Sequence, residues 1–228
     1  MPKTKPFDKY YKDYEEWFHR YEKVYKSELK AVAHFIPEKG RGIEIGIGNG
    51  MFALPLGIKE GVEPSYEMRK LARQKGLNAW FGVAEQLPFE DETYDFALMV
   101  TTICFVDNPR KVLHEIYRIL RLNGSIVIGF VDKNSPVGKI YQENKKKSKF
   151  YSEANFFSAG EVENLLDDAG FERMEFVQTI FGQLDEVEEE QDFKKGYGEG
   201  SFVVVRGVKK RAEWLRGLES EEEEEEEE

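Results

Sequence analysis

The sequence predicts an α/β fold: a doubly wound, mostly parallel sheet with helices on both faces and an antiparallel hairpin at its C-terminal end. Three observations predict it. Short apolar runs alternate with amphipathic runs between residues 41 and 131, which is the rhythm of strand–helix–strand units. A tight glycine turn at residues 46–50 follows the first apolar run directly. Two further apolar runs, at residues 171–179 and 201–208, are joined by a loop and suit a hairpin at the sheet edge.

Residues 8–35 precede the turn and are expected to form one aromatic helix. Tyr14, Trp17, Phe18, Tyr21 and Tyr25 recur there at helical spacing, which gives one aromatic stripe. Two interpretations of this stripe stay open, since it can pack the helix onto the domain or cover a bound ligand.

The elements of the sheet follow in order. Apolar runs predict strands at residues 41–45, 58–63, 78–81, 94–101 and 125–131. Helices are expected at residues 51–56, at residues 64–75 and at residues 109–122. After Asp132 the rhythm breaks into a lid-like insertion at residues 133–157 that carries a basic run and several aromatic side chains. A capping box of Ser158 and Glu161 then predicts a helix at residues 158–169.

Length and composition indicate one domain over residues 1–212. The 228 residues carry a formal charge of −11, and Glu221 to Glu228 supply eight of these negative charges. Residues 213–228 are therefore expected to be an acidic, disordered tail on a body near charge balance, which gives no sign of a nucleic-acid partner. Cys104 is the single cysteine and the three histidines are scattered, so no disulfide and no metal site is expected. Without a signal-peptide pattern or a membrane-length apolar run, we expect a cytoplasmic protein with no membrane partner.

Two carboxylates beside the glycine turn indicate the ligand. In a doubly wound sheet, ligands bind at the carboxyl ends of the strands, and Glu63 ends the second strand, where an acid can accept the hydroxyls of a ribose. Met51 stands where a dinucleotide motif needs its third glycine. Glu44, just before the turn, would repel a pyrophosphate but suits an ammonium. These features oppose an NAD-dependent oxidoreductase and favour S-adenosylmethionine.

The sequence resembles the class I S-adenosylmethionine-dependent methyltransferases, and most of all the subgroup called methyltransferase type 11. Over residues 14–176 the resemblance rests on six motifs in order: 44–50 (EIGIGNG), 61–65 (GVEPS) followed by Met68, 84–89 (AEQLPF), 94–98 (YDFAL), 115–124 (EIYRILRLNG) and 165–171 (LLDDAGF). The resemblance implies a Rossmann-like fold and S-adenosylmethionine as the methyl donor. It also implies donor-binding roles for Glu44, Gly46, Gly48, Asn49, Gly50, Glu63, Pro64, Met68, Ala84, Glu85, Gln86, Leu87, Thr101 and Thr102.

The chemistry predicted for this site is methyl transfer to a small-molecule acceptor by in-line displacement. Positioning and water exclusion accelerate such a displacement without a catalytic triad or a metal. The acceptor pocket is expected between the strand ends, the aromatic helix and the insertion. No catalytic residue is assigned, although Asp132, just past the fifth strand, is a candidate base. The alternative hypothesis is a non-catalytic regulatory module that binds S-adenosylmethionine. Glu63 could instead pair with Arg69 or Lys70, and Glu85 could be a solvated loop acid.

Overall fold

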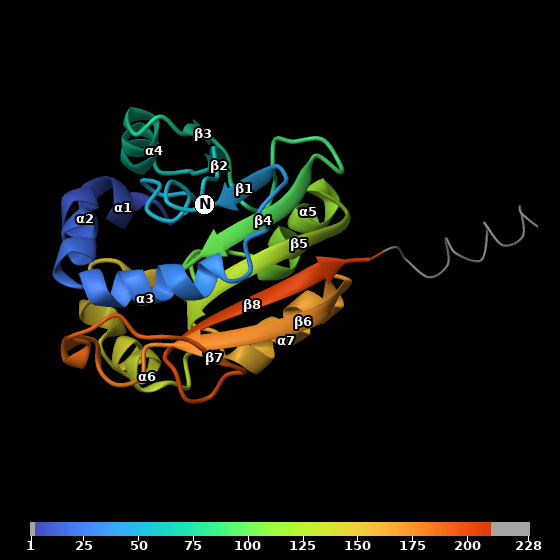
Figure 1. Ribbon diagram of the computed structural model, residues 1–228. Helices are drawn as coiled ribbons and strands as arrows, with labels where there is room; N and C mark the ends of the chain where they lie inside the picture. Colours follow the sequence, from blue (N-terminus) through green and yellow to red (C-terminus); the bar gives the residue numbers. More distant parts are fainter. Residues whose placement is uncertain (1–2, 211–228) are drawn as a thin grey trace, which may run out of the picture.

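The computed structural model describes residues 3–210, whose elements form a mixed α/β sandwich (Figure 1). In chain order these elements are α1 (Lys5–Lys9), α2 (Tyr11–Arg20), α3 (Glu22–Ala33), β1 (Gly42–Ile45), β2 (Glu60–Val62), α4 (Tyr66–Gln74), β3 (Asn78–Trp80), β4 (Tyr94–Val100), α5 (Pro109–Ile119), β5 (Leu120–Val131), α6 (Pro136–Glu143), η1 (Lys145–Lys147), η2 (Tyr151–Glu153), α7 (Ala159–Asp168), β6 (Phe171–Thr179), η3 (Leu184–Glu186), β7 (Lys194–Lys195) and β8 (Phe202–Lys209).

Within the described residues the strands make one eight-stranded sheet in the order β3-β2-β1-β4-β5-β8-β6-β7. Strands β1 to β5 pair in parallel, whereas β8 runs antiparallel to both β5 and β6. The predicted mostly parallel, Rossmann-like sheet with an antiparallel C-terminal hairpin is confirmed. The strand order reverses between β1 and β4, so the crevice that binds ligands in such sheets lies at the carboxyl ends of these two strands.

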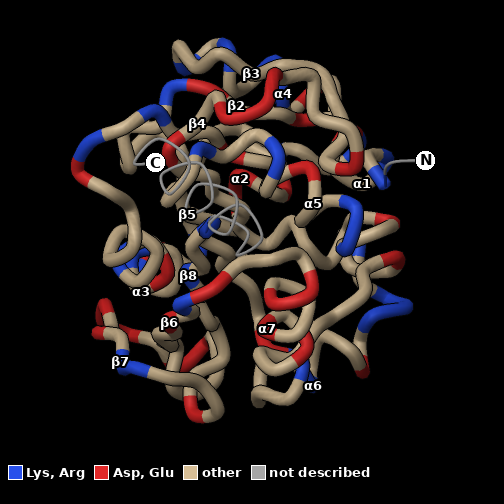
Figure 2. Tube along the Cα trace, turned by 90° about the vertical axis from the view of Figure 1, so that its right-hand side faces the viewer, with Lys and Arg blue, Asp and Glu red and all other residues tan. Residues whose placement is uncertain are grey.

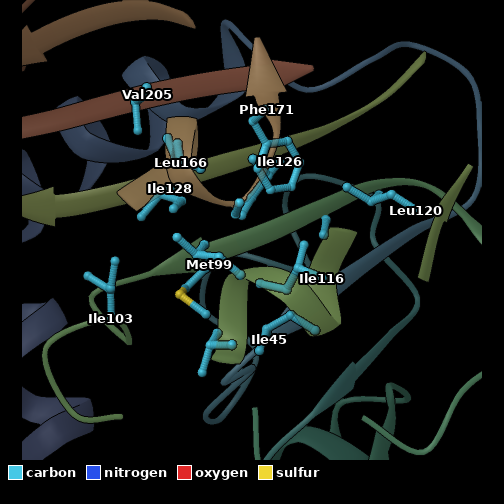
Figure 3. Close-up of a cluster of buried hydrophobic side chains, with 14 of the residues drawn as sticks. Ile45, Met99, Ile103, Ile116, Leu120, Ile126, Ile128, Leu166, Phe171 and Val205 are labelled. Atoms are coloured by element: carbon cyan, nitrogen blue, oxygen red, sulfur yellow. The ribbon is translucent and has the colours of Figure 1, made fainter. Parts of the chain in front are cut away.

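Two apolar clusters cover the two faces of the sheet. Helices α5 and α7 pack on one face, where Met99 and Ile128 point toward Ile116 and Leu166 (Figure 3). Helix α3 packs on the other face against β5, β6 and β8. Neighbouring positions of one strand divide between the clusters, because successive side chains of a strand point to opposite faces. The near-continuous apolar runs of β4 and β5 thus reflect strands covered on both sides.

The expected single N-terminal helix over residues 8–35 is wrong in its boundaries. The segment forms three helices, with breaks at Tyr10 and Tyr21, whose ψ angles of 28° and 44° are not helical. The aromatic stripe nevertheless forms, since the Phe18 ring lies 5.1 Å from both the Tyr14 ring and the Tyr25 ring. A periodic pattern identifies a helical face and gives no information on where the axis bends.

Three further boundaries differ from prediction. Residues 51–56 form turns and no helix, because Pro55 interrupts the short segment. Helix α4 begins two residues after Pro64, since the Ser65 side chain accepts a hydrogen bond from the Met68 N–H and acts as the N-cap. Helix α5 ends at Ile119, and β5 already begins at Leu120.

The predicted C-terminal elements are confirmed where the structure describes them. Ser158 and Glu161 form the predicted capping box of α7, and the strand over residues 171–179 is found as predicted. The lid-like insertion folds into α6, η1 and η2, and the loop before β8 contains η3 and β7. The prediction of an acidic tail at residues 213–228 lies outside the described residues.

Residues of both charge signs occur along the helices and loops of the backbone trace (Figure 2), in keeping with a body near charge balance. Between residues 3 and 210, none of the helices is both long and apolar enough to cross a membrane.

Candidate methyl-donor and acceptor site

The glycine turn after β1 lies directly against the end of β4. Gly46 has a φ of +75°, a conformation that side chains rarely adopt. A Cβ added to it would stand 2.4 Å from Oγ1 of Thr102. The backbone N–H groups of Gly46 and Ile47 both donate to the Val62 carbonyl, which fixes the turn to the end of β2. Only glycine therefore allows the turn to approach β4 so closely.

Glu63 is held under this turn with its carboxylate in the cavity. One carboxylate oxygen accepts from the Gly48 N–H at 3.0 Å, and the other accepts from the Ser65 N–H at 2.8 Å. The residue is 8% exposed. Burial raises the pKa of its carboxyl to about 7, although the two N–H donors oppose that shift. Arg69 bonds the Glu63 backbone carbonyl through its guanidinium, so the alternative in which it pairs with the carboxylate is not what the geometry shows.

Glu44, the other acid at the turn, lies behind it. Glu44 is 2% exposed and is not among the residues that line the cavity. Its Oε2 has no hydrogen-bond partner among the described residues, and burial raises its pKa well above the ordinary value. Asn49 and Gly50 also lie outside the cavity lining, and the Asn49 amide donates to Glu15 on α2. The turn thus presents Gly46 and Gly48 to the cavity and keeps its other predicted members behind them.

The carboxyl end of β4 forms the opposite wall. Thr101 and Thr102 both line the cavity, as predicted. Thr101 has a φ of +48°, which for a β-branched residue is a strained conformation of the kind found at functional sites. Thr102 donates its hydroxyl to the Val100 carbonyl at 3.0 Å. Cys104 is buried, and its Sγ donates to the Thr101 carbonyl. Because burial raises the pKa of the thiol to about 12, the reactive thiolate is disfavoured at neutral pH.

The predicted adenine side is brought together in part. Pro64, Met68 and Ala84 line the cavity. Glu85 also lines it, but its Oε1 accepts from the backbone N–H groups of Asp107 and Asn108 before α5. It is therefore no freely solvated acid. Gln86 and Leu87 are not among the lining residues.

Aromatic side chains from α1, α2, the loop after β4 and the insertion line the cavity. The lining includes Phe7, Tyr14, Trp17, Phe18, Phe105, Tyr141, Phe150 and Tyr151. The Phe7 ring contacts the rings of Phe105 and Phe150 at centroid distances of 5.0 and 5.6 Å. An ion pair of 2.6 Å between Lys149 and Asp13 joins the insertion to α2. The elements expected to form the acceptor pocket therefore do meet there.

Sequence reasoning missed two parts of this lining. Lys3, Thr4 and Phe7 precede the helix that was expected to begin at residue 8. Glu28, on α3, is the second part, since no site role was predicted for it. A signal for Glu28 existed, because it lies four residues after Val24 and four before Val32, within the apolar stripe that faces the core.

The structure places Asp132, the candidate base, outside the cavity lining. One carboxylate oxygen accepts from the Asn134 N–H at 2.7 Å and the other from the Ala159 N–H at 3.1 Å. It is buried and absent from the cavity lining. Its carboxylate caps the turn after β5 and the start of α7, which explains an acid at that strand end.

Comparison with known proteins shows the family. A family model described as "Methyltransferase domain" matches residues 43–128. A crystal structure from Thermotoga maritima, described as a SAM-dependent methyltransferase and possible histamine N-methyltransferase, is 50% identical, with a TM-score of 0.89 over 91% of this chain and 99% of that chain. An uncharacterised protein of Methanocaldococcus jannaschii is 47% identical over 89% of this chain and 98% of its own length. A phosphatidylethanolamine N-methyltransferase of Cereibacter sphaeroides is 28% identical over 64% of this chain and 77% of its own length.

With the glycine turn, the acid after β2 and the strand order already in place, these likenesses are decisive. The chain belongs to the class I S-adenosylmethionine-dependent methyltransferases and carries a methyltransferase domain of the type 11 subgroup.

Proposed function

We propose that the protein binds S-adenosylmethionine in this cavity and catalyses transfer of its methyl group to a small-molecule acceptor by in-line displacement. The observation that carries the proposal is the buried Glu63 carboxylate, held by two backbone N–H groups at the crevice between β1 and β4. Family membership supplies the reaction class.

The residues present fit the donor. Each carboxylate oxygen of Glu63 has two acceptor sites and uses one for a backbone N–H, so each keeps capacity for a ribose hydroxyl. Gly46 lines the cavity, and because it has no Cβ the turn can lie directly against Thr102. Pro64 and Met68 offer apolar contacts on the adenine side. Five further predicted residues lie outside the cavity lining and would support the site only indirectly, by shaping the turn and the loop after β3: Glu44, Asn49, Gly50, Gln86 and Leu87.

The same geometry disfavours a diphosphate. The Gly48 N–H, which a nucleotide phosphate would need, is already donated to Glu63. A second carboxyl, Glu44, lies buried beside the turn. A diphosphate would therefore be repelled by the Glu63 carboxylate at the cavity wall, and the buried Glu44 behind the turn would have to stay neutral.

The covered acceptor half favours an enzyme over a regulatory module. The donor supplies an electrophilic methyl group on a positively charged sulfur. The aromatic cover excludes water from the reacting atoms and holds the acceptor in position, which accelerates an in-line displacement. The printed names of two relatives mention amine acceptors, histamine and phosphatidylethanolamine. Small amines are therefore the first acceptors to test.

Calorimetric titration tests the proposal. S-adenosylhomocysteine should bind at one site per chain, whereas NADH should not bind. Incubation with methyl-labelled S-adenosylmethionine and pooled metabolites should transfer label to a small molecule. Absence of S-adenosylhomocysteine binding would overturn the assignment, and binding without any label transfer would favour the regulatory module.

A further inference from the structure

A second buried carboxylate faces the cavity, and the donor site does not use it. Glu28 on α3 lines the cavity and is 6% exposed. Over residues 3–210 its carboxylate makes no hydrogen bond and no ion pair, in contrast to Glu63 and Asp132. A buried charged group without a partner is unfavourable, so its retention there needs a reason.

Glu28 lines the cavity together with Tyr141 and Tyr151 of the insertion, which is one of the elements expected to form the acceptor pocket. Burial raises the pKa values of Tyr141 and Tyr151, and the only acid that contributes to the shift in either is Glu28. Burial also raises the pKa of Tyr14, and the carboxylates of Glu44, Glu63 and Glu28, in that order, raise it further. The Glu28 carboxylate is therefore close enough to act electrostatically on tyrosines of both α2 and the insertion, and all of these residues line one cavity.

The walls around this carboxylate suit a cation. Tyr14, Trp17, Tyr141 and Tyr151 line the cavity with Glu28, and aromatic faces attract ammonium groups. Among the described lining residues, acids outnumber bases: Asp13, Glu28, Glu63, Glu85 and Asp107 stand against Lys3. Lys3 lies within 3.6 Å of Asp107, which reduces its repulsion of a bound cation.

We propose that Glu28 binds the ammonium group of the acceptor, so that the acceptor is a small primary or secondary amine and Glu28 accepts its proton before methyl transfer. The inference rests on the proposed function and adds the acceptor class and the residue that selects it. An alcohol or thiol would bring no positive charge to the carboxylate. An anionic acceptor would be repelled by it.

The proton and electron balance is complete without a further reactant. The bound ammonium gives one proton to the Glu28 carboxylate, which exposes the lone pair of the nitrogen. That lone pair forms the new N–C bond as the methyl carbon separates from sulfur, whose bonding electrons stay on the sulfur. The nitrogen of the product takes up the positive charge that the sulfur loses. Burial raises the pKa of the Glu28 carboxyl to about 8, near the value that a proton acceptor for an amine requires at neutral pH.

Three variants of the full chain test the proposal. Glu28→Gln keeps the size of the side chain but neither the charge nor the proton acceptor, and Glu28→Asp keeps the charge on a shorter stem. Glu22→Gln is the matched control, because Glu22 is exposed on the same helix and pairs only with Lys26 among the described residues. The probes are histamine, 2-phenylethylamine, ethanolamine and putrescine, with 2-phenylethanol and ethylene glycol as matched alcohols.

We expect wild type and Glu22→Gln to methylate at least one of these amines on nitrogen and neither alcohol. Glu28→Gln should raise the KM for that amine at least tenfold while leaving the Kd for S-adenosylhomocysteine within about twofold, and Glu28→Asp should recover part of the loss. With saturating donor, kcat/KM of the wild type should fall up to tenfold per unit below about pH 8, whereas in Glu28→Gln the fall should begin at the higher pKa of the free amine, because only the deprotonated amine can then react. The neighbouring Tyr14, Tyr25, Tyr141 and Tyr151 stay neutral over this range, since burial raises their pKa values.

Each opposite result overturns the inference. Methylation of an alcohol, an unchanged amine KM in Glu28→Gln, or no methylation of any panel amine by protein that binds S-adenosylhomocysteine would exclude Glu28 as the amine anchor. Failure to bind S-adenosylhomocysteine at all would instead refute the proposed function itself. The two failures are therefore distinguished by one titration.

Discussion

Replacement of Glu63 by glutamine tests the donor site at its most sensitive point. Both carboxylate oxygens accept backbone N–H groups, from Gly48 and Ser65. Glutamine has one oxygen, so its NH2 group must face one of these N–H donors. The variant loses the charge that a ribose hydroxyl would meet, and it leaves one buried donor without an acceptor.

The magnitude follows from these contacts. A hydrogen bond to a charged group contributes about 1.5–3 kcal/mol, and a buried donor left unsatisfied costs about 1–3 kcal/mol. Part of the second cost falls on the ligand-free protein, so we expect a net loss of about 3 kcal/mol in binding. This corresponds to a rise in Kd on the order of 100-fold. The glutamine should also lower the melting temperature of the ligand-free protein.

Isothermal calorimetry with S-adenosylhomocysteine at pH 8 measures this change. Glu67→Gln is the control, because Glu67 lies on α4, pairs with Lys70 at 3.6 Å and is not in the cavity lining. Its Kd should stay within about twofold of the wild type. Since burial raises the pKa of Glu63 to about 7, wild-type binding should also weaken below pH 7 and the Glu63→Gln variant should not follow. A Glu63→Gln Kd within threefold of the wild-type value would refute the ribose assignment.

Three further predictions concern Gly46 in the turn, Asp132 after β5 and Glu28 in the cavity. Gly46→Ala should abolish S-adenosylhomocysteine binding, because its Cβ would meet Thr102 at 2.4 Å, whereas Gly160→Ala meets nothing within 4 Å and should bind normally in the same titration. Asp132→Asn should lower the melting temperature but leave the pH profile of methyl transfer unchanged. If the variant instead lost the acidic limb of this profile, Asp132 would be the base after all. Glu28 binds a proton in the folded state between its ordinary pKa of 4.5 and about 8, so stability should fall as pH rises through this window, by up to about 1.4 kcal/mol per unit. Thermal melts of Glu28→Gln should show a shallower decline, and equal slopes would contradict this.

The sequence pattern predicted the sheet well because each strand is marked by residues within its own short segment. The runs at β4 and β5 are apolar since both faces of these strands are covered, and the glycine turn marks the end of β1. The helix breaks at Tyr10 and Tyr21 could not be predicted in this way. They depend on how the N-terminal segment wraps over the cavity, which is a tertiary effect.

The site was predicted unevenly for a similar reason. Gly46, Glu63 and Thr102 lie at strand ends, and the parallel topology alone brings strand ends together. Asp132 also lies at a strand end, yet its oxygens are taken by backbone N–H groups that no spacing reveals. Position in the fold brings a carboxylate near a site, but its hydrogen-bond partners decide whether it is available there.

That criterion separates three of the buried acids of this chain by function. Asp132 has its oxygens occupied by backbone donors and lies outside the cavity lining, so it stabilises a turn. Glu63 is occupied in the same way but faces the cavity, so its spare acceptor sites can bind a ligand without loss of the local fold. Glu28 faces the cavity without any partner among residues 3–210, and the fold gains nothing from its charge. Ionisation of the Glu28 carboxyl lowers the stability of the fold over the neutral pH range, and a bound cation would give the carboxylate the partner that it lacks. We therefore infer that this acid is retained to bind the acceptor.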